Sequence, residues 1–216
     1  MKMTSLLLTA VIALTLAGCS SSMIKRNADQ EFPLAVNASA PAFIFPISLH
    51  GVPGDTTEIG LAISGAAVSE YGAAVISGQQ LSSIVGNLSW TLGENMRRQV
   101  SLNKMAMTGS AEKHAKELDE KMKTLTAKLK DLGAIDDQNY NFQYVIVLHV
   151  DSASGMQIPF MKKVTAFGGV VDMETRKIVS YIEKDITLAE GAVLGQMPVE
   201  MNKIIAELLN APEDDT

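Results

Sequence analysis

The amino-acid sequence predicts an α/β domain, with α+β as the alternative, in which a small mixed sheet is packed by long helices in a three-layer-like arrangement. Residues 142–150, 164–171 and 178–186 are apolar runs rich in β-branched and aromatic residues, as strands are. Residues 110–132 and 193–209 instead repeat apolar residues at steps of three and four, which is typical of helices with one buried stripe. Strands and helices in one chain favour a sheet covered by helices.

A short strand is predicted over residues 42–49, which are apolar and lead into a turn rich in glycine and proline. Pro46 has no backbone N–H to donate, so a central position in the sheet is disfavoured. His50, Asp55 and Glu58 surround the turn into the next helix and are candidate ligand-binding residues, because α/β proteins bind ligands at such junctions. The alternative is that these residues serve only as a turn and a helix cap.

A helical region with internal breaks is predicted over residues 57–98. Breaks are expected near Gly78 and Gly86, because each interior glycine costs a helix about 1 kcal/mol relative to alanine. Residues 59–76 are apolar and rich in small residues, so a membrane-spanning helix is an alternative. Glu70 argues against it, because a charged group in hydrocarbon costs about 2.5 kcal/mol or more. We therefore favour a soluble helix packed closely on the sheet.

The cleanest helix in the sequence is predicted over residues 110–132, with Ser110 at its N-terminal cap. Its apolar seam extends over about three heptads. The seam either packs on the core of the domain or forms a docking or oligomer surface. In the second case Leu118, Met122 and Leu125 are the candidate interaction surface.

The last third is predicted to be a strand meander followed by a helix. The polar residues 172–177 separate two apolar runs and predict an antiparallel hairpin beside the strand at 142–150. Residues 193–209 form a closing helix, and residues 211–216 an acidic tail.

The start of the chain predicts export. Lys2 supplies a positive n-region, residues 6–16 an apolar core, and Ala17 and Gly18 the small residues before a cleavage site. The apolar run is too short for a permanent span, which needs about 20 residues.

The segment Leu16-Ala17-Gly18-Cys19 resembles the lipobox of bacterial lipoproteins, in which the cysteine is acylated and becomes the new amino terminus. Cys19 is the one cysteine of the chain, and the alternative is an ordinary secretory signal with a chance cysteine. The resemblance implies a lipid anchor on Cys19, and Ser20 after it resembles the outer-membrane type, facing the periplasm. The expected organisation is a signal peptide, an acylated flexible tether, one α/β domain and an acidic tail, over residues 1–18, 19–41, 42–210 and 211–216.

Composition restricts the function further. The chain has 216 residues, 47% hydrophobic and 19% charged, which excludes a wholly disordered chain. Lys+Arg number 18 against 24 Asp+Glu, so the basic excess that nucleic-acid binding needs is missing. With one cysteine there is no internal disulfide, and no Cys/His cluster suggests a structural zinc site.

The order of predicted elements, with a short extended segment at residues 99–104, resembles the α/β domain of the curli-secretion and penicillin-binding-protein-activator lipoproteins and the TolB amino-terminal domain. The local match is the hairpin from Val171 to Val179, similar to their pattern of Val-Asp, a Thr-Gly turn and an apolar strand. Here Arg176 stands where that turn usually has glycine. The resemblance implies an envelope assembly or adaptor role and identifies no active site.

Candidate chemistry elsewhere is sparse. His149 and Asp151 are two apart on a strand and share a face, which allows a metal pair or an oriented base, although a hydrogen-bonded strand-end histidine is the commoner arrangement. No Gly-x-Ser-x-Gly or His-Glu-x-x-His motif accompanies them. We therefore expect no catalysis, no cofactor and no metal, and a lipoprotein that binds another envelope protein. The alternatives are a homo-oligomer, a secretion pore, and a small-ligand-binding lipoprotein that uses the 50–58 turn.

Overall fold

Three long antiparallel strands form the centre of the structure, which is a computed structural model. It describes residues 22–26, 31–52, 56–85, 88–131, 142–152 and 161–210. The strands are β5 (Tyr144–Ser152), β6 (Met161–Asp172) and β7 (Ile178–Ala189), and each pairs with the next along the chain. The predicted hairpin and its position beside the first strand are confirmed.

The turn between β6 and β7 explains the departure at Arg176. This residue has φ of 55°, the left-handed conformation that glycine adopts most readily. Asp172 supports the turn, because its Oδ1 accepts a 2.7 Å hydrogen bond from the backbone N–H of Thr175. Arginine therefore occupies a left-handed position that glycine would adopt more readily.

Short parallel strands extend the sheet on one side and make it mixed. These strands are β2 (Ala42–Ile44), β3 (Ser48–His50) and β4 (Val75–Ser77). Both β2 and β3 pair with β5, and β2 also pairs with β4, so the predicted strand is split in two around Pro46. Strand β4 was not predicted, because three residues between glycines carry too little pattern to separate a strand from a helix.

A further strand, β1 (Ser22–Arg26), pairs antiparallel with β7 and completes a seven-stranded sheet. Six strands follow the order β1-β7-β6-β5-β2-β4, and the seventh, β3, pairs with β5 outside this order. The flexible tether predicted over residues 19–41 is therefore wrong for these residues. Leu34 is also buried, and its N–H donates to the carbonyl of Leu209, so the fold includes residues before position 42. Backbone pairing at a sheet edge needs no apolar alternation, so the polar sequence of β1 gave no signal.

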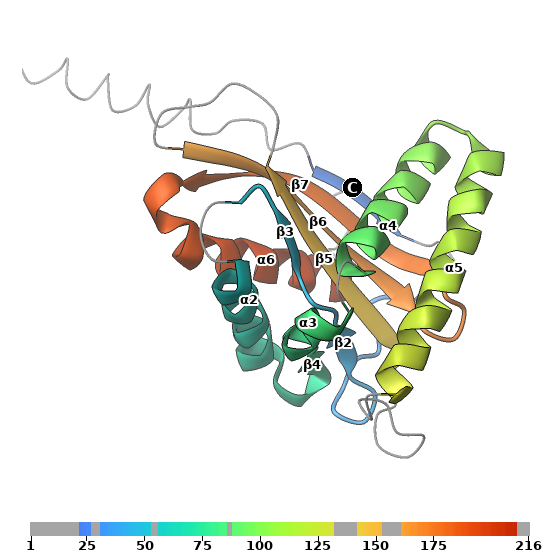
Figure 1. Ribbon diagram of the computed structural model, residues 1–216, viewed down its shortest axis with the longest axis horizontal. Coiled ribbons are helices and arrows are strands. Elements are labelled where there is room, and N and C mark those ends of the chain that lie inside the picture. The colour runs from blue at the N-terminus through green and yellow to red at the C-terminus, as the bar shows by residue number, and fades with distance from the viewer. Residues whose placement is uncertain are drawn as a thin grey trace, which may run out of the picture.

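Two pairs of helices cover the two faces of the sheet (Figure 1). One pair is α2 (Thr56–Tyr71) and α6 (Val193–Leu209), which bury an apolar core against the sheet. The other pair is α4 (Leu88–Lys104) and α5 (Thr108–Asp131), which lie side by side and enclose a second core. This three-layer α/β arrangement agrees with the predicted fold class, and α6 has the predicted bounds.

Two details of the helices differ from the sequence predictions, and a third agrees with them. Residues 99–104 belong to α4 rather than to an extended segment, because Val100 continues its buried face. Helix α5 begins at Thr108, before the predicted cap at Ser110. The short helix α3 (Ser82–Val85) lies between the two predicted break points. In the described part of the chain, no helix has the length and apolar character needed to cross a membrane.

Candidate functional site

The strongest concentration of polar groups lies under α4, toward the end of β5. Side chains alternate along a strand, so Val147, His149 and Asp151 face α4 while Leu148 and Val150 face the opposite core. The strand is thus apolar on both faces until its last residues, where one face becomes polar.

Arg97 on α4 connects this polar end to two other elements. Its guanidinium nitrogens lie 3.4 Å from Asp151 Oδ2, 3.3 Å from Glu183 Oε1 on β7, and 3.9 Å from Glu94 Oε1 one turn earlier on α4. Burial lowers the pKa of Arg97, but the carboxylates, Glu183 first among them, outweigh burial and raise it above the ordinary value. Arg97 therefore stays charged and holds three carboxylates together.

His149 is the buried member of the cluster, with none of its surface exposed. Its ring packs on Phe167, with ring centroids 4.8 Å apart. Nε2 lies 3.0 Å from Asp151 Oδ1, yet neither ring nitrogen makes a hydrogen bond of acceptable geometry to any described residue. Burial lowers the pKa of His149, although Asp151 opposes the shift. The imidazole is therefore mainly neutral at pH 7, and a neutral imidazole carries one nitrogen without a proton.

Close approach of α4 to the sheet is what places Glu94 and Arg97 over β5. At Gly93, a Cβ atom would lie 2.8 Å from Phe167 Cζ and 3.4 Å from the His149 Cβ. A larger residue there would push the helix outward. The start of α4 is also tied to the β2–β3 loop by a hydrogen bond from the Ser89 hydroxyl to the carbonyl of Pro46.

Tyr181 closes the site on the β7 side. Its hydroxyl donates a 2.8 Å hydrogen bond to Glu183 Oε2, and its ring stacks on Phe167 at a centroid distance of 5.9 Å. Burial, together with the charge of Glu183, raises the pKa of Tyr181 far above its ordinary value. The phenol therefore stays protonated and serves as a donor.

The structure brings only part of the predicted turn site together. His50 is 76% exposed at its side chain, and its Nδ1 lies 3.3 Å from Asp151 Oδ1. Glu58 is exposed in the first turn of α2, and Asp55 lies outside the described residues. The contact made by His50 therefore joins it to the end of β5.

The predicted interaction surface on α5 is not exposed. Leu118, Met122 and Leu125 are at most 1% exposed and belong to the core between α5, α4 and the sheet. The seam has the predicted helical spacing, but α4 covers it, so these three residues form no open docking patch.

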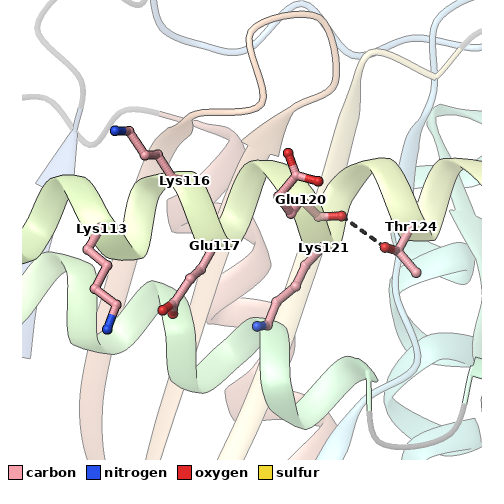
Figure 2. Close-up of a pocket in the computed structure, with 6 residues that line it drawn as sticks. All are labelled: Lys113, Lys116, Glu117, Glu120, Lys121 and Thr124. Atoms are coloured by element: carbon pink, nitrogen blue, oxygen red, sulfur yellow. Dashed lines mark hydrogen bonds between the residues drawn. The ribbon is translucent and has the colours of Figure 1, made fainter.

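The outer surface of α5 carries an open depression of about 390 Å³. It is lined by Lys113, Lys116, Glu117, Glu120, Lys121 and Thr124, all from this one helix. Figure 2 shows Lys113, Glu117 and Lys121 directed toward the neighbouring helix, and Lys116 and Glu120 directed away from it. Opposite charges one turn apart are typical of a solvated helix face, and the depression brings no second element to a ligand.

Comparisons with known proteins were made by family, by sequence and by structure. No family model and no curated protein matches the chain. Among solved structures, the PelC dodecamer from Paraburkholderia phytofirmans is 10% identical, with a TM-score of 0.45 over 89% of this chain and 100% of the other. Lipoprotein GNA1162 from Neisseria meningitidis is 15% identical, with a TM-score of 0.34 over 78% of this chain and 99% of the other. This is a weak structural resemblance that includes a lipoprotein, and no residue role is carried over from it.

Sequence reasoning identified His149 and Asp151 as a pair but missed Glu94, Arg97 and Glu183. One signal was present, since the apolar strand β7 contains Tyr181, Glu183 and Asp185 at alternating positions. A polar row on one face of a buried strand indicates a charged partner opposite it.

Proposed function

We propose that this protein is a lipid-anchored lipoprotein of the bacterial envelope that faces the periplasm from the outer membrane and acts in assembly or as a non-catalytic adaptor. The anchor is supported by the lipobox-like Leu16-Ala17-Gly18-Cys19, and the outer-membrane assignment by Ser20. The observation that carries the proposal is that β1 begins at Ser22, only three residues after Cys19.

A domain joined to its anchor by so few residues is held against the bilayer. Three residues reach at most about 10 Å even when fully extended. Ser22 pairs with Lys184 and Met23 with Glu183, so the anchored end of β1 is level with the charged cluster. An acylated Cys19 would therefore keep this end of the sheet close to the membrane surface, where partners in the same membrane are within reach.

The cluster itself supports a binding role rather than a catalytic one. Arg97 lies against Glu94, Asp151 and Glu183, so the cluster is organised by ion pairing. The sequence contains no recognised catalytic motif around His149.

Acylation and anchoring are tested by metabolic labelling with an alkyne-bearing palmitate analogue, followed by membrane fractionation. The wild-type protein is expected to be labelled and membrane-bound, and Cys19→Ser to be unlabelled and released. Label that persists in Cys19→Ser, or an unlabelled wild-type protein, would contradict the anchor.

The adaptor role is tested by crosslinking in native envelopes, with a ten-residue Gly/Ser insertion between Cys19 and Ser22. The same insertion after Thr216 is the matched control. A stoichiometric envelope protein is expected to crosslink to the wild type and the control, and to be lost when the anchor is lengthened. Capture of this chain alone would favour a homo-oligomer. A tightly held small molecule would favour the ligand-binding alternative at His50, Asp55 and Glu58.

A further inference from the structure

We propose that Glu94, His149 and Asp151, joined by His50, form a binding site for a divalent transition-metal ion such as Zn²⁺. The proposal rests on the described geometry under α4 and does not depend on the lipid anchor or on an adaptor role.

Three donor atoms from two elements already converge. One ligand atom each from Glu94, His149 and Asp151 lie within 4.8 Å of one another. Donors bound to zinc at about 2.1 Å stand roughly 3 to 4 Å apart, so a shift of about 1 Å brings these atoms to binding distance. The 3.0 Å between His149 Nε2 and Asp151 Oδ1 is already that of two ligands on one ion.

An unpartnered buried imidazole indicates that the carboxylates are more than a surface acidic cluster. His149 is fully buried; its Nδ1 has no partner among the described residues, and its Nε2 lies 3.0 Å from Asp151 Oδ1 without a well-aligned hydrogen bond. Leaving a buried polar atom without a partner costs about 1 to 3 kcal/mol, so such atoms need an explanation. A metal bound to Nε2 would give that nitrogen a partner, with Asp151 beside it, and would leave Nδ1 as it is.

His50 on β3 lies outside this group of three but beside Asp151, and its exposed side chain can turn to bring a fourth donor. Its Nδ1 lies 3.3 Å from Asp151 Oδ1, the same oxygen that faces His149. One carboxylate oxygen thus stands between two imidazole nitrogens. Two histidines and two carboxylates suit zinc and its neighbours in the first transition row, whereas Mg²⁺ and Ca²⁺ prefer oxygen alone.

Arg97 fits the same site as an outer partner. It lies against Asp151 Oδ2 and leaves Oδ1 directed to the histidines, which is how an outer-shell group fixes a ligating carboxylate. The three carboxylates of Glu94, Asp151 and Glu183 and the guanidinium of Arg97 are half-buried. Together they carry a net charge of two negative charges, which a divalent cation would neutralise. Arg98 is 64% exposed and only approaches Glu94 at 4.0 Å.

The test is a zinc titration of the full chain carrying Cys19→Ser, which removes the one thiol that would bind zinc. Bound metal is first removed from the protein with a chelator. Zinc binding is then measured by competition with a chromogenic chelator, and Mg²⁺ is the negative control. We expect one zinc per chain with a micromolar or lower Kd. Asp151→Asn and Glu94→Gln are expected to weaken binding at least tenfold, because each removes a ligand.

Matched variants separate this site from other weak zinc ligands. Asp185→Asn is the control for Asp151→Asn, because Asp185 is a similarly half-buried strand carboxylate that pairs with Lys163. His114→Ala is the control for His50→Ala, because His114 likewise lies beside a carboxylate, that of Glu117. We expect His50→Ala to weaken binding about tenfold and both controls to stay within twofold of the parent.

Cobalt provides a second readout that does not depend on a buried substitution. Bound Co²⁺ is expected to give the intense visible absorption of a four-coordinate ion, and the exposed His50→Ala substitution to reduce that intensity. Three results would overturn the proposal. The first is that the parent chain binds no stoichiometric zinc, and the second is that Asp151→Asn binds zinc with parental affinity while circular dichroism shows an intact fold. The third is that His114→Ala weakens binding as much as His50→Ala does.

Discussion

The two faces of the sheet are built from the same strands but bury different kinds of side chain. Toward α2 and α6, β5 presents Leu148 and Val150 to an apolar core, and the face stays apolar to the end of the strand. Toward α4, the same strand presents Val147 and then His149 and Asp151. Burying polar groups costs free energy unless they are paired. The α4 face therefore has less apolar packing at this end of β5, where the polar cluster lies. The difference shows that one face of β5 buries apolar side chains alone, whereas the other combines an apolar core with a charged cluster.

The largest effect is expected from the apolar face. Leu148→Ala removes a fully buried side chain and leaves a cavity, which costs about 2 to 5 kcal/mol in the free energy of unfolding. Urea unfolding measures this loss. A cost below about 1 kcal/mol would show that the core under α2 and α6 does not support the fold as described.

The next effect is a pH dependence expected from His149 on the α4 face. Burial lowers the pKa of His149 below its ordinary value of 6.5, while Asp151 and Glu94 oppose the shift and Arg97 adds to it. The unfolded chain therefore binds a proton more readily than the folded chain. The contribution of His149 to stability is therefore present above about pH 6.5 and decreases as the pH falls below it, by up to about 1.4 kcal/mol per pH unit.

Urea midpoints at pH 7.5 and pH 5.5, in the presence of a chelator, measure this dependence. His149→Gln is expected to reduce the difference between the two midpoints, whereas His114→Gln is expected to retain it. An unchanged difference in His149→Gln would assign the pH dependence to another group.

A smaller effect is expected for the cation of the cluster. Arg97→Gln leaves Glu94, Asp151 and Glu183 without their shared partner, which we expect to cost about 1 to 2 kcal/mol, since Arg97 is one-third exposed and partly screened. Arg98→Gln is the matched control, because Arg98 is exposed on the same helix, and its loss should stay within about 0.5 kcal/mol. Equal effects for the two variants, measured by urea unfolding, would contradict a special role for Arg97.

The smallest effect lies in the β6–β7 turn, away from the centre of both faces. Arg176 has a left-handed backbone and pairs with Asp119 at 3.0 Å. Glycine and alanine both remove the ion pair, but only glycine adopts this backbone freely. Arg176→Gly is therefore expected to be about 1 kcal/mol more stable than Arg176→Ala in thermal unfolding, and the reverse order would contradict the turn conformation.

Predictions from the sequence were accurate where the local sequence pattern is enough to determine a helix or a turn. The spacing of apolar residues in α6 and the polar turn between β6 and β7 depend on local pattern, and both were predicted correctly. The same pattern placed the seam of α5 correctly but could not show that α4 covers Leu118 and Met122. Exposure of a stripe depends on which other element packs on it, and this is a property of the tertiary fold.

The cluster could be predicted only in part for the same reason. His149 and Asp151 are neighbours on one strand, so their pairing follows from strand periodicity. Glu94 and Arg97 reach them only because α4 crosses the sheet closely at Gly93. Strand β1 escaped prediction because it pairs with β7 through its backbone, and its sequence has no apolar alternation.

The most direct test of the central claim, that the α4 face carries a built metal site, is anomalous diffraction at the zinc absorption edge from crystals of the full chain grown with one equivalent of zinc. The account predicts one strong peak within about 2.2 Å of His149 Nε2 and Asp151 Oδ1. A map with no peak there, or with its strongest peak at His114, would contradict it.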